Sequence, residues 1–186
     1  MCLSQSLSRR STVSNTHRIF SMAKKHSGAQ GSTPATVALA KLGIDFEARS
    51  YQHDPGVSDF GREAAEALGV SPERVFKTLL AEADGALVVG IVPVAGKLDL
   101  KSLAAAVGAR KAVMADPTLA ERKTGYVVGG ISPIGQRTRL RTVLDESALG
   151  YETVLVSGGR RGFDIELTPA GLLRATDGLT APIARP

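Results

Sequence analysis

Two hairpin patterns constrain the fold of this chain more than any other feature. Residues 74–94 hold two apolar, β-rich runs separated by Asp84-Gly85, a dipeptide typical of two-residue hairpin turns. Residues 153–167 hold two further runs around a glycine-rich connection. Hairpins join antiparallel strands, whereas a doubly wound parallel sheet needs a helix between successive strands. The sequence therefore predicts a largely antiparallel mixed sheet.

Short helices are predicted where a capping residue, an apolar stripe and a closing glycine follow one another, or where proline stands at a helix start. The expected helices lie between Thr33 and Gly43, at 60–68, at 99–107, after Asp116 and after Thr168, and the expected strands are 44–49, 74–83, 86–94, 153–157 and 163–167. A chain of 186 residues is long enough for one substantial core. We predict a mixed α/β fold with short helices in a single compact domain, residues 31–186.

The net charge of +5 is confined to the N-terminal segment. Residues 1–30 contain five basic residues and no acidic residue, so residues 31–186 carry 23 − 5 = 18 basic against 18 acidic residues. The predicted domain is electrically neutral. Any contact with RNA therefore has to rest on local patches or on a partner protein.

Residues 1–30 are expected to be a disordered, basic and Ser-rich tail. The composition resembles a transit peptide, but Met22 begins a stretch that looks like an ordinary polar bacterial N-terminus. Residues 1–21 are then either an extension from an upstream start or a disordered segment, and we expect no targeting role for them. No apolar run approaches the roughly 18 residues that cross a bilayer, so we expect a cytoplasmic protein with no membrane contact.

Cysteine and histidine are too scarce for several kinds of site. Cys2 is the single cysteine, and His53 is the only histidine after residue 30. The domain therefore has no disulfide, no cysteine nucleophile and no His/Cys metal cluster, and no metal or cofactor is expected. A serine hydrolase is disfavoured because the G-x-S-x-G motif is absent and a triad would have to use His53, which lies in an H-D-P turn.

Lys77 is an unusual residue for its position in VFKTLLAEA. Strand alternation places it on one otherwise apolar face and Thr78 on the other. A charge there is unfavourable unless it lies at a sheet edge, reaches solvent or serves a site. A lysine that protects an edge strand and a lysine that belongs to a site both remain open from this pattern.

Two glycine-rich segments have the same ambiguity. TGYVVGGISPIGQ, residues 124–136, suits either backbone that runs close to a ligand or a tight turn, and it contains no phosphate-loop motif. VSGGRRGFDIEL places Ser157 before a hairpin and Asp164 after it. Pairing across the hairpin would bring the two together, but Ser and Asp are also common at hairpin ends for turn reasons alone.

Arginines form a third candidate feature. Arg137, Arg139 and Arg141 alternate, and an extended segment would place them on one face. With Arg160 and Arg161 they form either a phosphate-contacting patch or ordinary solvated surface charge.

Taken together, several segments resemble the YbaK-type Cys-tRNA(Pro) and Cys-tRNA(Cys) deacylases, relatives of the editing insertion domain of bacterial prolyl-tRNA synthetases. The resemblance runs from about residue 33 to about residue 175. Its motifs are YQHDP, VFKTLL, VPVAGKLDLKSLAAAVGARK, MADP, TGYVVGGISPIGQ and VSGGRRGFDIEL. Several long motifs in the same order make a chance match very improbable, and they imply an editing-domain fold.

The resemblance also implies a site and a reaction. Lys77 and Asp164 would be catalytic, and the substrate would be bound by Tyr51, Phe60, Thr78, Gly129, Gly130 and Ser157. The glycine segment would direct backbone N–H groups toward the aminoacyl carbonyl. In this family the substrate's own cysteine thiol attacks its ester, which fits a domain that lacks a thiol of its own.

The implied partners are a tRNA(Pro) that carries cysteine and prolyl-tRNA synthetase. Editing would be needed because a site built for proline rejects a residue of similar volume by only about 1–3 kcal/mol. Two other functions stay open: an editor of another small misacylated residue, such as alanine on tRNA(Pro), and a non-catalytic adaptor that binds the synthetase or tRNA.

Overall fold

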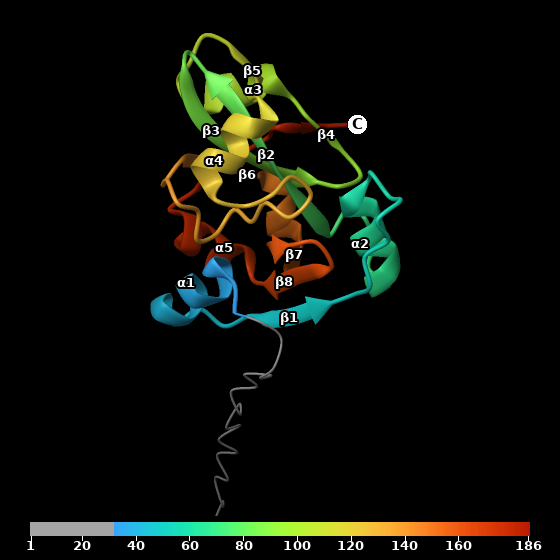
Figure 1. The fold of residues 1–186 in the computed structure, drawn as a ribbon. Helices are drawn as coiled ribbons and strands as arrows, with labels where there is room; N and C mark the ends of the chain where they lie inside the picture. Colours follow the sequence, from blue (N-terminus) through green and yellow to red (C-terminus); the bar gives the residue numbers. More distant parts are fainter. Residues whose placement is uncertain (1–31) are drawn as a thin grey trace, which may run out of the picture.

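One eight-stranded mixed sheet organises the chain in the computed structural model, which describes residues 32–186 (Figure 1). The helices are α1 Pro34–Leu42, α2 Phe60–Leu68, α3 Leu100–Ala106, α4 Pro117–Thr124 and α5 Pro169–Thr176, with a 3-10 helix at Glu146–Gly150. The strands are β1 Glu47–Ser50, β2 Val75–Ala83, β3 Ala86–Pro93, β4 Lys97–Leu98, β5 Ala112–Met114, β6 Arg141–Asp145, β7 Val154–Arg160, β8 Phe163–Leu167, β9 Leu179–Ala181 and β10 Ala184–Arg185. The tail expected at residues 1–30 lies outside the described residues.

The strand order of the large sheet is β1-β8-β7-β2-β3-β6-β9, and β5 also pairs with β2. β2 therefore lies in the middle of the sheet, so an edge-strand role for Lys77 is wrong. The pairs β2–β7, β3–β6 and β6–β9 are parallel, and the others in this sheet are antiparallel. The prediction of a mixed α/β fold is confirmed. The parallel pairing of β2 with β7 joins the two predicted hairpins into one sheet.

Both predicted hairpins are present. Asp84 and Gly85 connect β2 to β3 with positive φ angles of 47° and 86°, as a tight primed turn requires. The second hairpin is longer than predicted, because β7 continues to Arg160 through an irregularity in pairing after Ser157. This bulge re-aims the glycine-rich turn relative to the strands.

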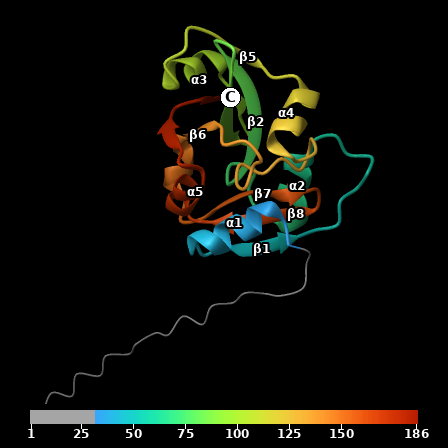
Figure 2. The ribbon, with the colours of Figure 1, turned by 60° about the vertical axis from the view of Figure 1, so that its left-hand side comes forward.

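The sheet is covered on both faces. Phe76 and Leu80 of β2 pack into a cluster that includes Leu39 of α1 and Leu172 of α5. On the opposite face, Ala81 packs with α3, while Val75 packs with α2. Figures 1 and 2 show α3 beside β5 at one end of the sheet and α1 beside β1 and β8 at the other. The two-residue alternation along β2 thus separates two buried layers.

Capping residues set the helix boundaries as predicted. Asp99 caps α3 by accepting from the Ser102 N–H, and Thr168 caps α5 by accepting from the Gly171 N–H. The first strand is shifted, since β1 begins at Glu47 rather than at Ile44. Ile44 lies directly after α1 instead of in the strand. Its N–H donates to the Leu39 carbonyl, and its buried side chain packs in the core.

Candidate active site

A gap in the pairing of β2 creates the candidate site. β3 occupies one edge of β2 along almost its whole length. The other edge pairs with β7 only at Val75 and Phe76, and with β5 only from Ala81 to Ala83. The Leu80 carbonyl accepts from the Ala115 N–H at 3.0 Å, so the backbone from residue 77 to residue 79 borders a space between β7 and β5. A cavity of about 340 Å³ lies there.

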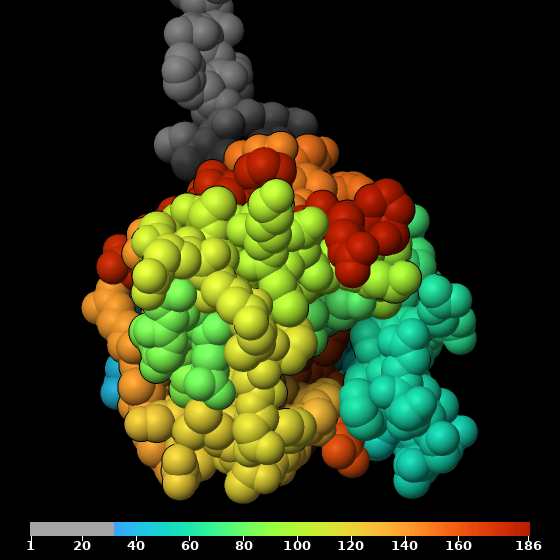
Figure 3. Space-filling view, turned by 90° about the horizontal axis from the view of Figure 1, so that it is seen from above, coloured from blue at the N-terminus to red at the C-terminus, as the bar shows by residue number. Residues whose placement is uncertain are grey.

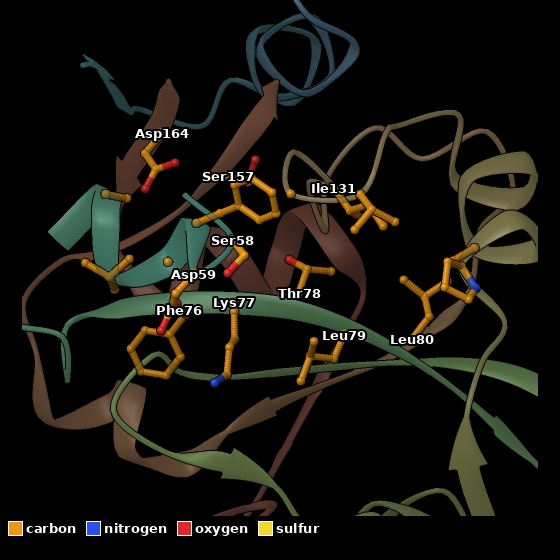
Figure 4. A pocket seen from close by; sticks show the side chains of 18 of the residues that line it. Ser58, Asp59, Phe76, Lys77, Thr78, Leu79, Leu80, Ile131, Ser157 and Asp164 are labelled. Carbon is orange, nitrogen blue, oxygen red and sulfur yellow. The ribbon is translucent and has the colours of Figure 1, made fainter. Parts of the chain in front are cut away.

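The cavity wraps around this open edge and receives side chains from both faces of β2 (Figure 4). Figure 3 shows the surface hollowed between the teal segment around residues 50–70 and the yellow segment around residues 115–130. Seven of the residues implied by the resemblance line the cavity: Tyr51, Phe60, Lys77, Thr78, Gly129, Ser157 and Asp164. The structure thus brings these residues together, while their individual roles stay predictions.

Thr78 presents unpaired polar groups to the gap. Val94 donates to the Val75 carbonyl at 2.8 Å, so the odd-numbered residues of β2 form the ladder with β3. The main-chain N–H and C=O of Thr78 consequently point toward the other edge, where no described strand pairs with them. The buried Oγ1 of Thr78 also has no hydrogen-bond partner among the described residues. A buried polar group without a partner indicates a place where a ligand or water binds.

Lys77 leaves β2 on the side opposite to Thr78 (Figure 4). Its Nζ donates to the Val94 carbonyl at 3.4 Å. Burial lowers the pKa of Lys77, and the negative charge of Asp59 partly opposes that shift. No described contact joins Lys77 to Asp164, and the catalytic roles of both stay predictions.

Asp164 and Ser157 form a directly opposed pair across β7 and β8, as predicted. Asp164 is only 6% exposed. Burial raises its pKa to about 7. The Tyr51 hydroxyl lies nearby: burial, followed by the charges of Asp164 and Glu63, raises the pKa of Tyr51 to about 12. Near neutral pH this wall of the cavity therefore carries a neutral phenol and a carboxyl group that is close to its titration point.

Phe60 forms the mouth of the cavity together with the glycine segment. A Cβ atom at Gly129 would lie 2.7 Å from the Phe60 ring, and the φ of Gly129 is +85°, so only glycine fits there. His53 packs against the same ring, with 5.7 Å between ring centroids, and its Nδ1 lies 2.8 Å from Glu63 Oε2. These contacts fix the loop before α2 against the helix.

Gly130 differs from the expectation. It is buried behind the cavity wall and is not among the lining residues. Its N–H donates to the Val127 carbonyl at 2.9 Å, so that donor is occupied within the turn. A Cβ atom on Gly130 would lie 2.9 Å from the Arg160 Cα. Close packing of two loops thus explains a glycine at this position, and its contact with substrate stays a prediction.

Several lining residues carry no individual signal in the sequence. Ser58 and Asp59 come from the loop before α2. Met114 ends β5, Pro117 begins α4, and Ala115 lies between these two elements. Three of these five belong to the MADP motif, which could have indicated them, whereas Ser58 and Asp59 lie in none of the family motifs. Met114, Ala115 and Pro117 are apolar, and the other two are polar.

The predicted arginine face is divided in the structure. Arg139 forms an ion pair with Asp177 at 2.8 Å, and Arg141 donates to the Val107 carbonyl at 2.7 Å. Only Arg141 lies in a strand. Arg137 instead contacts α4, where its Nη1 donates to the Arg122 carbonyl at 3.5 Å.

Two further features are absent from the described part of the chain. Among residues 32–186, no three His, Cys, Asp or Glu side chains gather in a way that could hold a metal ion. Within the same part of the chain, no helix is long and apolar enough to span a membrane.

Comparison with known proteins identifies the family. The sequence profile of the aminoacyl-tRNA editing domain matches residues 54–175, well over half of the chain. This chain belongs to the aminoacyl-tRNA editing family. The match includes every residue that lines the cavity except Tyr51, and it confirms the resemblance seen in the motifs.

Individual relatives of this aminoacyl-tRNA editing domain agree. A protein of Enterococcus faecalis, EbsC, named as a candidate Cys-tRNA(Pro)/Cys-tRNA(Cys) deacylase, is 42% identical over 120 residues, which cover 64% of this chain and 73% of EbsC. A proline–tRNA ligase of Moorella thermoacetica is 37% identical over 73 residues, 39% of this chain and 13% of the ligase. A crystal structure of a candidate trans-editing enzyme for prolyl-tRNA synthetase superposes with a TM-score of 0.71 at 27% identity, covering 84% of this chain and all of that one.

Proposed function

We propose that this editing domain removes cysteine from mischarged Cys-tRNA(Pro), and that Cys-tRNA(Cys) is a second substrate. The observation that carries the proposal is the 42% identity to a relative with that name, over 73% of the relative's length. The small, mostly apolar cavity beside the open edge of β2 supports it, because it suits a small aminoacyl group.

The reaction uses the thiol of the substrate. The cysteine sulfur attacks the ester carbonyl, the bond from that carbonyl to the ribose oxygen breaks, and a cyclic thiolactone and free tRNA leave. The proton lost by the thiol is balanced by the proton gained by the ribose oxygen. Residues 32–186 contain no cysteine, and their one histidine, His53, does not line the cavity. An enzyme-borne nucleophile is therefore hard to find, whereas an intramolecular thiol gains from proximity.

Three protein groups would orient the ester for this attack. Thr78 offers its hydroxyl and its free main-chain edge to the aminoacyl group. The ionised Asp164 attracts the α-ammonium group of the substrate. Lys77 donates from its ammonium to the ester or ribose oxygens, for which its flexible side chain has to turn away from the Val94 carbonyl.

Substrate analogues test the thiol step. We would measure single-turnover deacylation of tRNA(Pro) charged with cysteine, S-methylcysteine, serine or alanine, together with Cys-tRNA(Cys). Cysteine esters should be cleaved, while the S-methyl and serine esters persist, because a thiol is a few per cent ionised at neutral pH and a hydroxyl is not. Cleavage of the S-methyl ester at a rate close to that of cysteine would falsify the thiol mechanism. Preferential cleavage of the alanine ester would instead assign the chain to alanine editing.

Recognition of the tRNA body is proposed to need prolyl-tRNA synthetase. The domain from residue 31 onward carries 18 basic and 18 acidic residues, so it lacks a long-range field that attracts RNA. Partial similarity to a proline–tRNA ligase is in keeping with a functional link. At physiological salt, the dissociation constant for tRNA(Pro) should be far larger without the synthetase than with it. Nanomolar binding by the isolated chain would contradict this requirement.

A further inference from the structure

We propose that five basic side chains beside the mouth of the cavity bind the phosphates at the acceptor end of an RNA substrate. This surface, the phosphate patch, consists of Arg122, Lys123, Arg137, Arg160 and Arg161. The proposal rests on the function proposed above, since it supplies the contact that holds the RNA next to the site.

Arg161 connects the patch to the cavity. Its guanidinium donates to the Val128 carbonyl at 2.9 and 3.2 Å and lies over the Phe60 ring at 4.7 Å from the centroid. Val128 and Phe60 both line the cavity. Phosphates held near Arg161 would therefore lie just outside the space where the aminoacyl ester reacts.

The other members surround the same loop. The main chain of Arg160 packs against Gly130, and its guanidinium lies 4.8 Å from the centre of the Phe163 ring. Arg137 bonds through its main chain to Thr124 and reaches the carbonyl of Arg122, the neighbour of Lys123 in the last turn of α4. All five side chains are exposed. The glycine segment thus forms a wall with the cavity on one side and cations on the other.

Charge is locally unbalanced at this surface although the domain is neutral. Residues 121–137 and 157–162 contain the five cations and one acid, Glu121, which gives 5 − 1 = +4. Glu121 already accepts from the Val128 N–H at 2.8 Å. None of the five cations forms an ion pair within residues 32–186, whereas Arg110 and Arg139 do. Five cations without ion-pair partners therefore lie beside the cavity of a domain that is neutral overall. Such a cluster is suited to bind a polyanionic ligand.

Exposed apolar side chains favour RNA over a free phosphate as the ligand. Val127 is 54% exposed and Val128 is 38% exposed. Val128 lines the cavity, and its carbonyl accepts from Arg161 of the patch. An RNA acceptor end offers phosphates for the cations and unpaired bases for the apolar surface. In Figure 3 the yellow segment that contains this loop rims the hollow.

Two substrates separate phosphate contact from effects on the cavity. We would compare kcat/KM for full-length Cys-tRNA(Pro) with that for 3′-cysteinyl adenosine, which has the ester but no phosphate. The test variant is R122Q/K123Q, whose two residues do not line the cavity. The matched control is R110Q/K111Q, another adjacent and exposed Arg-Lys pair outside the patch and the cavity. Thermal unfolding would verify that each variant is folded.

We expect R122Q/K123Q to lower kcat/KM on the tRNA at least tenfold near 0.15 M salt and to leave the adenosine ester within twofold. The slope of log kcat/KM against log salt should become shallower by roughly 1.4 to 1.8, since each phosphate contact contributes about 0.7 to 0.9. The control should match the wild type on both substrates. Equal losses on both substrates, an unchanged salt slope, or a loss seen only when the synthetase is present would overturn the phosphate patch.

A binding measurement distinguishes failure of this proposal from failure of the proposed reaction. If the wild type cleaves no cysteinyl ester, the reaction is wrong, and the patch is then tested with an uncharged acceptor-stem duplex carrying a single-stranded 3′ end. A salt-dependent affinity that R122Q/K123Q weakens and R110Q/K111Q does not would still support it. Equal affinities for both variants would reject it.

Discussion

Ser157 and Asp164 face each other across the β7–β8 hairpin, and this pairing places a buried carboxyl group at the wall of the cavity. Asp164 has no ion-pair partner among the described residues. Burial of such a carboxyl group favours its protonated form, so ionisation of Asp164 opposes folding unless a substrate cation compensates. Binding of an ammonium group in the site would therefore offset the unfavourable free energy of ionising the buried Asp164.

The pH dependence of stability tests this burial. The pKa of Asp164 rises from 3.8 to about 7 in the folded state, so its stabilising contribution is complete below pH 4 and is lost as pH rises to 7. D164N should lack this loss and become more stable than the wild type above pH 7, by a difference on the order of 4 kcal/mol at most. Denaturant unfolding at pH 4, 5.5, 7 and 8 measures it. A constant difference across that range would exclude a raised pKa.

The pH dependence of kcat/KM should follow the ionisation of Asp164 as well. Because the ionised carboxylate is proposed to hold the substrate ammonium, kcat/KM of the wild type should show an inflection near pH 7, above which it rises further only with ionisation of the substrate thiol. D164N should lower kcat/KM and remove this inflection, leaving only the ionisation of the substrate thiol. A profile with the inflection intact in D164N would assign the titration to another group.

Thr78→Val separates stability from function. Valine has nearly the shape of threonine and removes the Oγ1 that lacks a partner, which relieves about 1 kcal/mol of unfavourable burial. We expect Tm to rise by about 2–4 °C for a domain of this size and kcat/KM to fall about tenfold or more. Thr78→Ser, which keeps the hydroxyl, should retain most of the activity. A drop in Tm for the valine variant would show that the hydroxyl is already satisfied in solution.

Lys77→Ala should lower kcat/KM for deacylation at least about 100-fold, because it removes the charged donor that we propose reaches the ester or ribose oxygens. The half-buried side chain contributes little core volume, so the fold should persist. Lys101→Ala, at an exposed position on α3, is the control and should behave as the wild type. Near-normal turnover of Lys77→Ala with Cys-tRNA would remove Lys77 from the site.

Local sequence signals predicted the parts of the fold that depend on neighbouring residues. Asp84-Gly85 specified the β2–β3 turn, and Asp99 and Thr168 specified helix starts, because turn and cap chemistry acts over a few residues. The short strands β5, β6 and β9 had no such signal. They are three to five residues long and pair with partners distant in sequence, so tertiary packing rather than propensity decides them.

The residues of the site could be predicted only where they belong to motifs of the family. Alternation along β2 correctly placed Lys77 and Thr78 on opposite faces, but it could not show that both reach one cavity. That follows from the missing pairing partner between Phe76 and Ala81, which is a property of the whole sheet. For the same reason the arginines at 137, 139 and 141 looked equivalent in sequence, although Asp177 neutralises Arg139 and leaves Arg137 free of an ion pair.

Two glycines provide a matched pair for testing whether the glycine segment positions the site. Gly130 and Gly150 both have ordinary φ angles, so alanine is tolerated by the backbone at either position. At Gly130, however, a Cβ atom would lie 2.9 Å from the Arg160 Cα, while at Gly150 nothing lies within 4 Å. Main chain cannot yield as a flexible side chain does, so Gly130→Ala has to push the loop of residues 126–131 away from the β7–β8 turn.

That displacement moves Gly129 and Val128, which line the cavity, together with the anchor of Arg161 on the Val128 carbonyl. We expect Gly130→Ala to lower kcat/KM at least tenfold on both Cys-tRNA(Pro) and 3′-cysteinyl adenosine, because misplacement by about 1 Å can cost 100-fold in rate. Gly150→Ala should leave both rates within twofold. Since the loop rather than the core is displaced, Tm should fall by only a few degrees. Equal rates for the two variants would show that the loop adapts freely and that its close packing on Arg160 does not hold the site in place.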